Sequence, residues 1–98
     1  MSKYFPREFL HRIRNEIPMA RLLAQLDWPH KNRDGRLCLI CPRCREYLTV
    51  VNPRTNLARC FPCAVNYNTI DLTMRIQECD FVDAVHQLEG LLPPSHNI

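Results

Sequence analysis

Two short segments, Cys41-Pro42-Arg43-Cys44 and Cys60-Phe61-Pro62-Cys63, each place two cysteines three positions apart, and 15 residues separate them. Two cysteines at this spacing in a tight turn, a zinc knuckle, aim both sulfurs at one point. Two knuckles then complete a tetrahedron around one metal ion, with Zn–S bonds of about 2.3 Å. The pattern therefore predicts one Zn²⁺ bound by Cys41, Cys44, Cys60 and Cys63. The intervening residues suffice for a strand, a turn and a returning strand.

The other cysteines leave one ligand choice open. Cys38 lies three positions before Cys41 and can replace one of the ligands, but Pro42 suits a knuckle turn, so we prefer Cys41 with Cys44. Cys79 lies in a helical pattern and is expected to be a small buried side chain. A disulfide framework would need an oxidising compartment, and a redox Cys-x-x-Cys motif normally occurs as a single copy. Zinc is therefore the favoured interpretation.

Residues 1–29 are predicted to form leading helices. Pro6 suits the first position of a helix, and Pro29 ends the second helical pattern. The apolar stripe of that second pattern repeats at i, i+3, i+4 and i+7 and consists of Met19, Leu22, Leu23 and Leu26. We expect this stripe to face the core or a partner protein.

Residues 36–68 are predicted to form a zinc ribbon. Leu37–Ile40, Tyr47–Val51 and Leu57–Arg59 have strand-like composition, with a turn joining the last two. His30–Arg36, which contains Asn32, Asp34 and Gly35, is expected to be a turn. The two cysteine knuckles then lie at the ends of strands.

Residues 69–92 are predicted to form two C-terminal helices, the first capped by Asn68 or Thr69 and the second by Asp80. Residues 93–98 are expected to be a frayed tail. We therefore assign the fold to the α+β class: a small zinc ribbon, with a short antiparallel sheet and two cysteine knuckles, flanked by N- and C-terminal helices. A chain of 98 residues suits a single domain, 1–98.

The formal net charge of +3 is unevenly distributed. Residues 1–59 carry 12 of the 13 basic side chains and five of the ten acidic ones, whereas residues 60–98 have only Arg75 against the other five acids. Eleven of the cations are arginines, which suit phosphate binding and base stacking. A basic half of this kind is typical of a nucleic-acid surface, although a solvated face is equally compatible with so small a net charge.

Taken together, these residues resemble the N-terminal zinc-binding domain of bacterial-type (DnaG-type) DNA primases. The similarity covers about residues 5–92. It lies in the two knuckle segments, in the strand Leu48-Thr49-Val50 and in Phe81-Val82-Asp83-Ala84-Val85.

The chain departs from the family pattern at several positions. Cys44 stands where the family usually has a histidine ligand, and the segment after the first knuckle is short. The glycines after the second knuckle are replaced by Ala64, Asn66 and Asn68. Because Asn tolerates positive φ, we expect the turn to survive. These differences fit a divergent relative with four cysteine ligands.

The resemblance implies a function in primer synthesis during DNA replication, with the exposed ribbon face contacting a single-stranded DNA template. It also implies that polymerisation resides in a separate catalytic domain, so we expect no enzymatic activity from this chain alone. The expected partners are single-stranded DNA and a primase catalytic domain or replicative helicase. No apolar run approaches the roughly 20 residues that span a bilayer. We therefore expect a cytoplasmic, nucleoid-associated protein with no membrane partner.

The candidate DNA contacts are the cationic, aromatic and hydroxyl side chains of the ribbon: Arg43, Arg45, Tyr47, Thr49, Arg54 and Arg59. Tyr47 is the candidate base-stacking platform, although a half-buried strand tyrosine fits equally well, and Phe61 is expected in the core. Arg43 and Arg45 can instead hydrogen-bond to ligand sulfurs.

Two other functions remain open on the sequence. The first is a zinc-stabilised protein-interaction module that docks a replication or regulatory partner through the apolar stripe of residues 19–26. The second is a transcription-associated zinc ribbon, which the helices after the second knuckle make less natural.

Overall fold

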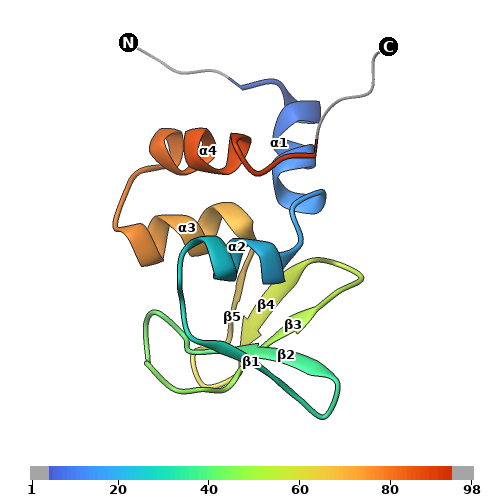
Figure 1. The fold of residues 1–98 in the computed structure, drawn as a ribbon. Coiled ribbons are helices and arrows are strands. Elements are labelled where there is room, and N and C mark those ends of the chain that lie inside the picture. The colour runs from blue at the N-terminus through green and yellow to red at the C-terminus, as the bar shows by residue number, and fades with distance from the viewer. Residues whose placement is uncertain (1–4, 94–98) are drawn as a thin grey trace.

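The computed structural model describes residues 5–93, in which a five-stranded antiparallel sheet packs against four helices (Figure 1). The elements are α1 (Arg7–Asn15), α2 (Met19–Gln25), β1 (His30–Arg33), β2 (Arg36–Leu39), β3 (Thr49–Asn52), β4 (Leu57–Cys60), β5 (Val65–Tyr67), α3 (Thr69–Gln77) and α4 (Phe81–Glu89). This arrangement confirms the predicted α+β class, with helices on both sides of the ribbon in the chain. Residues 1–4 of the predicted leading segment and 94–98 of the predicted tail lie outside the described residues.

The strands follow one another across the sheet in chain order, from β1 to β5. Figure 1 shows α2 and α3 next to the sheet, with α1 and α4 beyond them. No helix among residues 5–93 is long and apolar enough to cross a membrane.

The prediction of a turn over His30–Arg36 was wrong. His30–Arg33 forms the edge strand β1, and only Asp34 and Gly35 form the turn to β2, with φ values of +53° and +79°. Positive φ at both central residues is typical of a two-residue hairpin turn of type I′. All four β1 residues are exposed, so no alternation of apolar and polar side chains marked the strand in the sequence.

The apolar stripe of α2 packs within the chain itself. Met19, Leu22 and Leu23 are at most 1% exposed and belong to one core cluster with residues of the other helices and of the sheet. Three of the four residues of the stripe therefore face the core, and the fourth, Leu26, is half-buried against it.

Polar side chains tie the helices to the sheet and to one another. Asn56, in the turn between β3 and β4, accepts a hydrogen bond from the backbone N–H of Met19 and donates to the carbonyl oxygens of Arg14 and Ile17. The Thr69 hydroxyl donates to the carbonyl oxygen of Ile13. The turn of one hairpin is thereby fixed to the corner between α1 and α2.

The N-termini of α3 and α4 are capped by side chains. The Asn68 side chain accepts from the N–H of Asp71, whose carboxylate accepts from the N–H of Asn68, which together form a capping box. Asn68, not Thr69, is therefore the cap of α3. The Asp80 carboxylate caps α4 by accepting from the N–H of Asp83, as the sequence predicted.

Candidate metal centre

The structure brings the four cysteines of the two knuckles together. Their sulfur atoms all lie within 4.8 Å of one another, and they form the only such group of three or more His, Cys, Asp or Glu side chains within residues 5–93. Two of the Sγ–Sγ distances are 3.9 Å, between Cys41 and Cys63, and 3.6 Å, between Cys44 and Cys60. A tetrahedral Zn²⁺ site with Zn–S bonds of about 2.3 Å requires sulfurs separated by roughly 3.8 Å. The cluster thus has the size that a tetrahedral metal ion needs.

The cluster contains no disulfide bond and does not include Cys38. All six cysteines are free thiols. Cys38 lies on β2, where it pairs with Val50 of β3, and its sulfur donates a hydrogen bond to the carbonyl oxygen of Arg36, at 3.8 Å. Four cysteines, Cys41, Cys44, Cys60 and Cys63, are therefore positioned to coordinate a metal ion.

The sheet and two tight turns position these sulfurs. Cys60 ends β4, and Cys41 lies two residues beyond β2. The C-terminal ends of β2 and β4, which flank β3, therefore each supply the first cysteine of one knuckle. In the first turn the N–H of Arg45 donates to the carbonyl oxygen of Cys41, at 2.9 Å. In the second, the N–H of Ala64 donates to the carbonyl oxygen of Phe61, at 3.2 Å.

The residue after each second cysteine has a left-handed backbone conformation. The φ values are +66° at Arg45 and +57° at Ala64. We expected asparagines to supply positive φ after the second knuckle, but Asn66 lies in β5 and Asn68 has a φ of −89°. An alanine therefore takes the strained position itself.

The sulfur of Cys41 has two hydrogen-bond partners that are not cysteines. Its sulfur lies 3.3 Å from the Tyr67 hydroxyl oxygen and accepts from the N–H of Arg43, also at 3.3 Å. Burial would raise the pKa of Cys41, but hydrogen bonds from Tyr67 and from the backbone of Cys44 and Arg43 outweigh it and lower this pKa from 9.0 to about 6. Burial, followed by the neighbouring thiols, raises the pKa of Cys63 to about 12. A bound cation is therefore needed to deprotonate the whole set near neutral pH.

The six candidate DNA contacts do not share one surface. Arg43 and Arg45 are exposed in the first knuckle loop, and Arg54 is exposed in the turn between β3 and β4. The Arg45 guanidinium lies 6.0 Å from the centre of the Trp28 ring. Of the two arginines, it is the backbone N–H of Arg43 that reaches a ligand sulfur.

Thr49 is fully buried, and its hydroxyl has no hydrogen-bond partner among the described residues. It lies on the face of β3 that covers the core, so it cannot contact a ligand on the sheet surface. Tyr47 is half-buried, and the Lys31 ammonium lies 4.5 Å from the centre of its ring. A base stacking on that side of the ring would have to displace Lys31.

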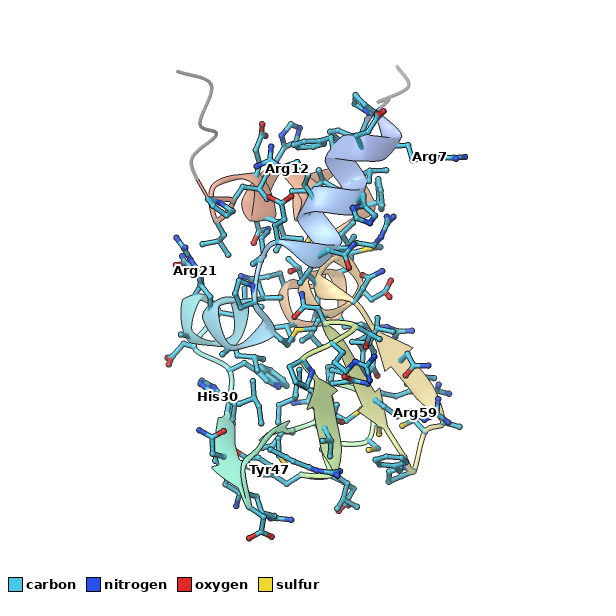
Figure 2. The ribbon with its side chains drawn as sticks, turned by 90° about the vertical axis from the view of Figure 1, so that its right-hand side faces the viewer. Arg7, Arg12, Arg21, His30, Tyr47 and Arg59 are labelled. Atoms are coloured by element: carbon cyan, nitrogen blue, oxygen red, sulfur yellow. The ribbon has the colours of Figure 1, made fainter. Side chains whose placement is uncertain are left out.

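Phe61 was expected in the core but is 63% exposed. It follows Arg59 by two positions, and the Arg59 guanidinium lies 5.9 Å from the centre of its ring. The alternation of side chains along β4 could have placed both residues on one face. Figure 2 shows Arg59 on the sheet, away from Arg7 and Arg12 of α1.

Strand pairing places residues of the neighbouring strands on the same side of the sheet as Arg59 and Phe61. The sequence alone did not indicate these residues. Cys38, Val50, Arg59 and Asn66 are successive partners across β2 to β5. We call the side of the sheet turned away from the core the outer sheet face, formed by Arg33, Arg36, Leu48, Val50, Asn52, Leu57, Arg59, Phe61 and Asn66.

Two adjoining hollows lie on the outer sheet face. One has a volume of about 570 Å³ and the other about 330 Å³, and both are lined by Arg36, Val50 and Phe61. Arg59 lines the first, and Arg33 and Asp34 line the second. The surface thus combines arginines with an exposed aromatic ring.

No protein-family model matches this chain and no curated protein matches it in sequence, so the resemblance to primase zinc-binding domains rests on the residues quoted above.

Proposed function

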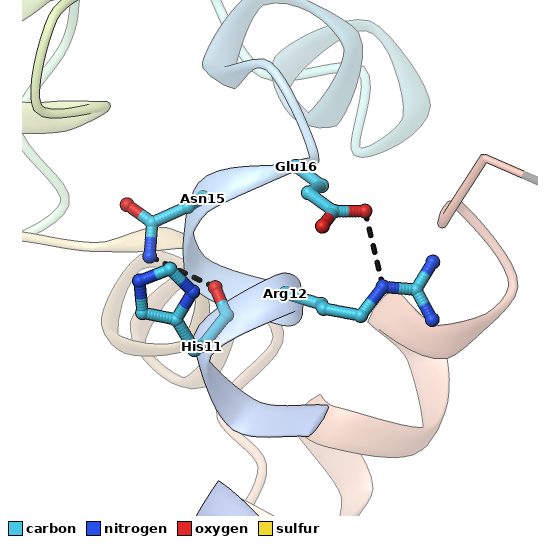
Figure 3. A network of polar contacts seen from close by, with 4 residues as sticks. All are labelled: His11, Arg12, Asn15 and Glu16. Atoms are coloured by element: carbon cyan, nitrogen blue, oxygen red, sulfur yellow. Dashed lines mark hydrogen bonds and ion pairs between the residues drawn. The ribbon is translucent and has the colours of Figure 1, made fainter. Parts of the chain in front are cut away.

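We propose that this chain is a zinc-stabilised module that binds single-stranded DNA across its outer sheet face in support of primer synthesis. The observation that carries the proposal is a set of arginines without acidic partners around an exposed aromatic ring. Arg33, Arg36 and Arg59 form no ion pair within residues 5–93. In that part of the chain, Arg12 alone among the arginines pairs with a carboxylate, that of Glu16 at 3.0 Å (Figure 3).

An anionic partner satisfies these cations. Guanidinium groups bind phosphates through two parallel hydrogen bonds, and the nearest acid on this surface, Asp34, lies in the turn between β1 and β2. Four thiolates with one Zn²⁺ add a charge of −2, so the attraction depends on where the arginines lie and not on the net charge of the domain.

The exposed ring favours a single strand over a duplex. Stacking on Phe61 requires a base whose face is open, which paired DNA does not offer. The ring is 63% exposed and lies beside Arg59, so a stacked base and its phosphate can be bound by neighbouring side chains. We therefore place the stacking platform at Phe61 in preference to Tyr47.

The metal has a structural role in this proposal. Soft thiolate ligands in a tetrahedral arrangement are typical of zinc, and four protein ligands leave no open position for catalysis. Because Phe61 lies inside the second knuckle, the bound metal fixes the backbone on which the stacking ring is mounted.

The assignment to primer synthesis follows from the resemblance quoted above. In this proposal the chain delivers a template strand to a primase catalytic domain, carried on the same or another polypeptide, and does not polymerise nucleotides itself. The zinc-loaded chain alone should therefore show no primer synthesis.

The test is fluorescence anisotropy of a labelled oligothymidylate with zinc-loaded protein at two salt concentrations. We expect a Kd on the order of 10⁻⁴–10⁻⁶ M and a marked loss of affinity as salt rises from about 50 to 200 mM. Phe61→Ala should weaken binding about 5- to 150-fold, which corresponds to about 1–3 kcal/mol per stacked base. Replacing Arg36 and Arg59 by Gln should reduce the salt slope by roughly 1.4, or about 0.7 for each phosphate contact.

Arg21→Gln is the matched control, since Arg21 is an exposed arginine on α2 (Figure 2). It should leave the affinity within about twofold of wild type, because a single distant charge is largely screened. Absence of binding by zinc-loaded wild-type protein at low salt would refute the proposal. An equal effect of Arg21→Gln and of the paired substitution would move the binding surface away from the sheet.

A further inference from the structure

One side chain other than cysteine reaches a ligand sulfur in the described part of the chain. The Tyr67 hydroxyl lies 3.3 Å from the sulfur of Cys41, and both residues are buried, with 5% and 0% of their surfaces exposed. Tyr67 ends β5, in which it pairs with Ala58 of β4, two positions before Cys60. The sheet therefore places the phenol of Tyr67 next to the metal centre, although Tyr67 is 26 positions away from Cys41 in the sequence.

The phenol has no other role that its contacts reveal. Cys41 is the one hydrogen-bond partner of the Tyr67 hydroxyl within residues 5–93. Leaving a buried hydroxyl unsatisfied is costly, and a thiolate is a stronger acceptor than a neutral thiol. The pairing is therefore favourable in the state in which Cys41 is deprotonated, which is the metal-bound state.

The proton belongs to the tyrosine in this pair. A metal-bound thiolate has no proton to donate, so the Tyr67 hydroxyl, 3.3 Å from the sulfur, acts as the donor. The N–H of Arg43 donates to the same sulfur. Cys41 thus accepts two hydrogen bonds from opposite parts of the chain, the first knuckle and β5.

We infer that Tyr67 is a positioning residue of the metal centre, whose O–H···S hydrogen bond orients the Cys41 thiolate and helps the site to retain its metal. The inference rests on metal binding as proposed above. Groups that hydrogen-bond to metal ligands typically contribute about 10- to 100-fold to metal affinity. Tyr67 also directly precedes Asn68, the cap of α3, so the same contact links the metal to the helical layer.

The test compares wild-type protein, Tyr67→Phe and the matched control Tyr47→Phe, all as full chains. Tyr67→Phe removes only the buried hydroxyl and keeps the ring in the core. Tyr47 has its ring against Lys31, with no contact to sulfur among the described hydrogen bonds. Zinc affinity is measured by competition with a chromophoric chelator, and the sulfur-to-metal charge-transfer band is measured after cobalt(II) substitution.

We expect zinc to bind Tyr67→Phe about 10- to 100-fold more weakly than wild type. The cobalt(II) charge-transfer band should move to lower energy, because a thiolate that loses a hydrogen bond becomes a better electron donor. Tyr47→Phe should match wild type in both measurements. A zinc affinity of Tyr67→Phe within about twofold of wild type would overturn the inference, and so would weaker binding with an unchanged band, which indicates a role in packing alone.

A measurement on wild-type protein keeps the inference testable if the variant does not fold. In the cadmium-substituted protein, the Tyr67 hydroxyl proton should exchange slowly with solvent and couple to the metal through the hydrogen bond. A rapidly exchanging, uncoupled proton would contradict the inference. Failure of wild-type protein to bind any metal would instead refute the metal centre itself, so the two outcomes are distinguishable.

Discussion

At the scale of single residues, positive φ in the knuckles is the clearest conflict between amino-acid type and backbone conformation. Arg45 and Ala64 close the two cysteine turns with φ values of +66° and +57°. For residues with a Cβ atom this conformation is disfavoured by roughly 1–2 kcal/mol. The tight turns that gather the four sulfurs are therefore formed at the expense of local strain.

Replacing Ala64 by Gly should relieve this strain. We expect the free energy of unfolding of zinc-loaded protein to rise by about 0.5–1 kcal/mol, because the loss of the Cβ clash exceeds the added entropy of the unfolded chain. Urea denaturation measures the change. Ala24→Gly is the control, since Ala24 is exposed within α2, and it should lower the free energy of unfolding by about 0.5–1 kcal/mol. Destabilisation by Ala64→Gly would show that the turn does not store strain.

Thr49 was expected on the surface and Phe61 in the core, and both expectations were wrong. The reason is that alternation along a strand does not reveal which of its two faces is buried. The sequence places Tyr47, Thr49 and Val51 on one face of their strand, but both faces of the strand carry apolar residues. Packing against the helices buries Thr49 and Val51 and leaves Leu48 45% exposed. The choice between the two faces depends on contacts far along the chain, which local periodicity does not contain.

At the scale of elements, one turn residue replaces the missing N-terminal cap of α2 at the corner between α1 and α2. Pro18 precedes α2 and supplies no side-chain cap. Asn56 satisfies the N–H of Met19 at 3.0 Å, and it donates to two carbonyl oxygens of the corner at 2.9 Å and 2.7 Å. Its side chain therefore fixes the hairpin of β3 and β4 to the helical layer.

Asn56→Gly should remove the side-chain hydrogen bonds and leave the backbone conformation unchanged, because Gly adopts the φ of +56° without strain. We expect the free energy of unfolding to fall by about 2–4 kcal/mol, since two buried backbone groups and one partly buried group lose their partner. The measurement is urea denaturation of zinc-loaded protein. Asp34→Gly is the control at an exposed turn position of positive φ and should be neutral or slightly stabilising. A change below about 0.5 kcal/mol for Asn56→Gly would contradict this account.

Elements with strong local signals could be predicted, whereas those formed by distant pairing could not. The caps at Asn68 and Asp80 depend on residues three positions away, and the sequence places both helices. The edge strands β1 and β5 were missed, because β1 is polar on both faces and β5 has only three residues. The role of Tyr67 at the metal centre depends on β5 and was missed with it.

At the scale of the whole molecule, the metal centre and the helices share one core. Cys41 and Cys60 belong to the same buried cluster as Leu72 of α3 and Val85 of α4. Asn56 adds hydrogen bonds between the sheet and the helices, and Thr69 links α3 to α1. A core continuous through both layers favours cooperative unfolding over separate melting of the ribbon.

Removal of the metal should therefore unfold the ribbon and the helices together. In cobalt(II)-loaded protein titrated with a chelator, loss of the charge-transfer band and loss of the far-UV helical signal should follow one curve, because metal binding and folding are coupled. Cys60→Ser should fail to fold for the same reason, whereas Cys79→Ser, outside the four-cysteine cluster, should bind one metal ion and stay folded. A helical signal that persists after the band has disappeared would show that α1, α3 and α4 are stable without the metal. In that case the metal would organise only the sheet surface, and chelation should abolish DNA binding while the helices remain.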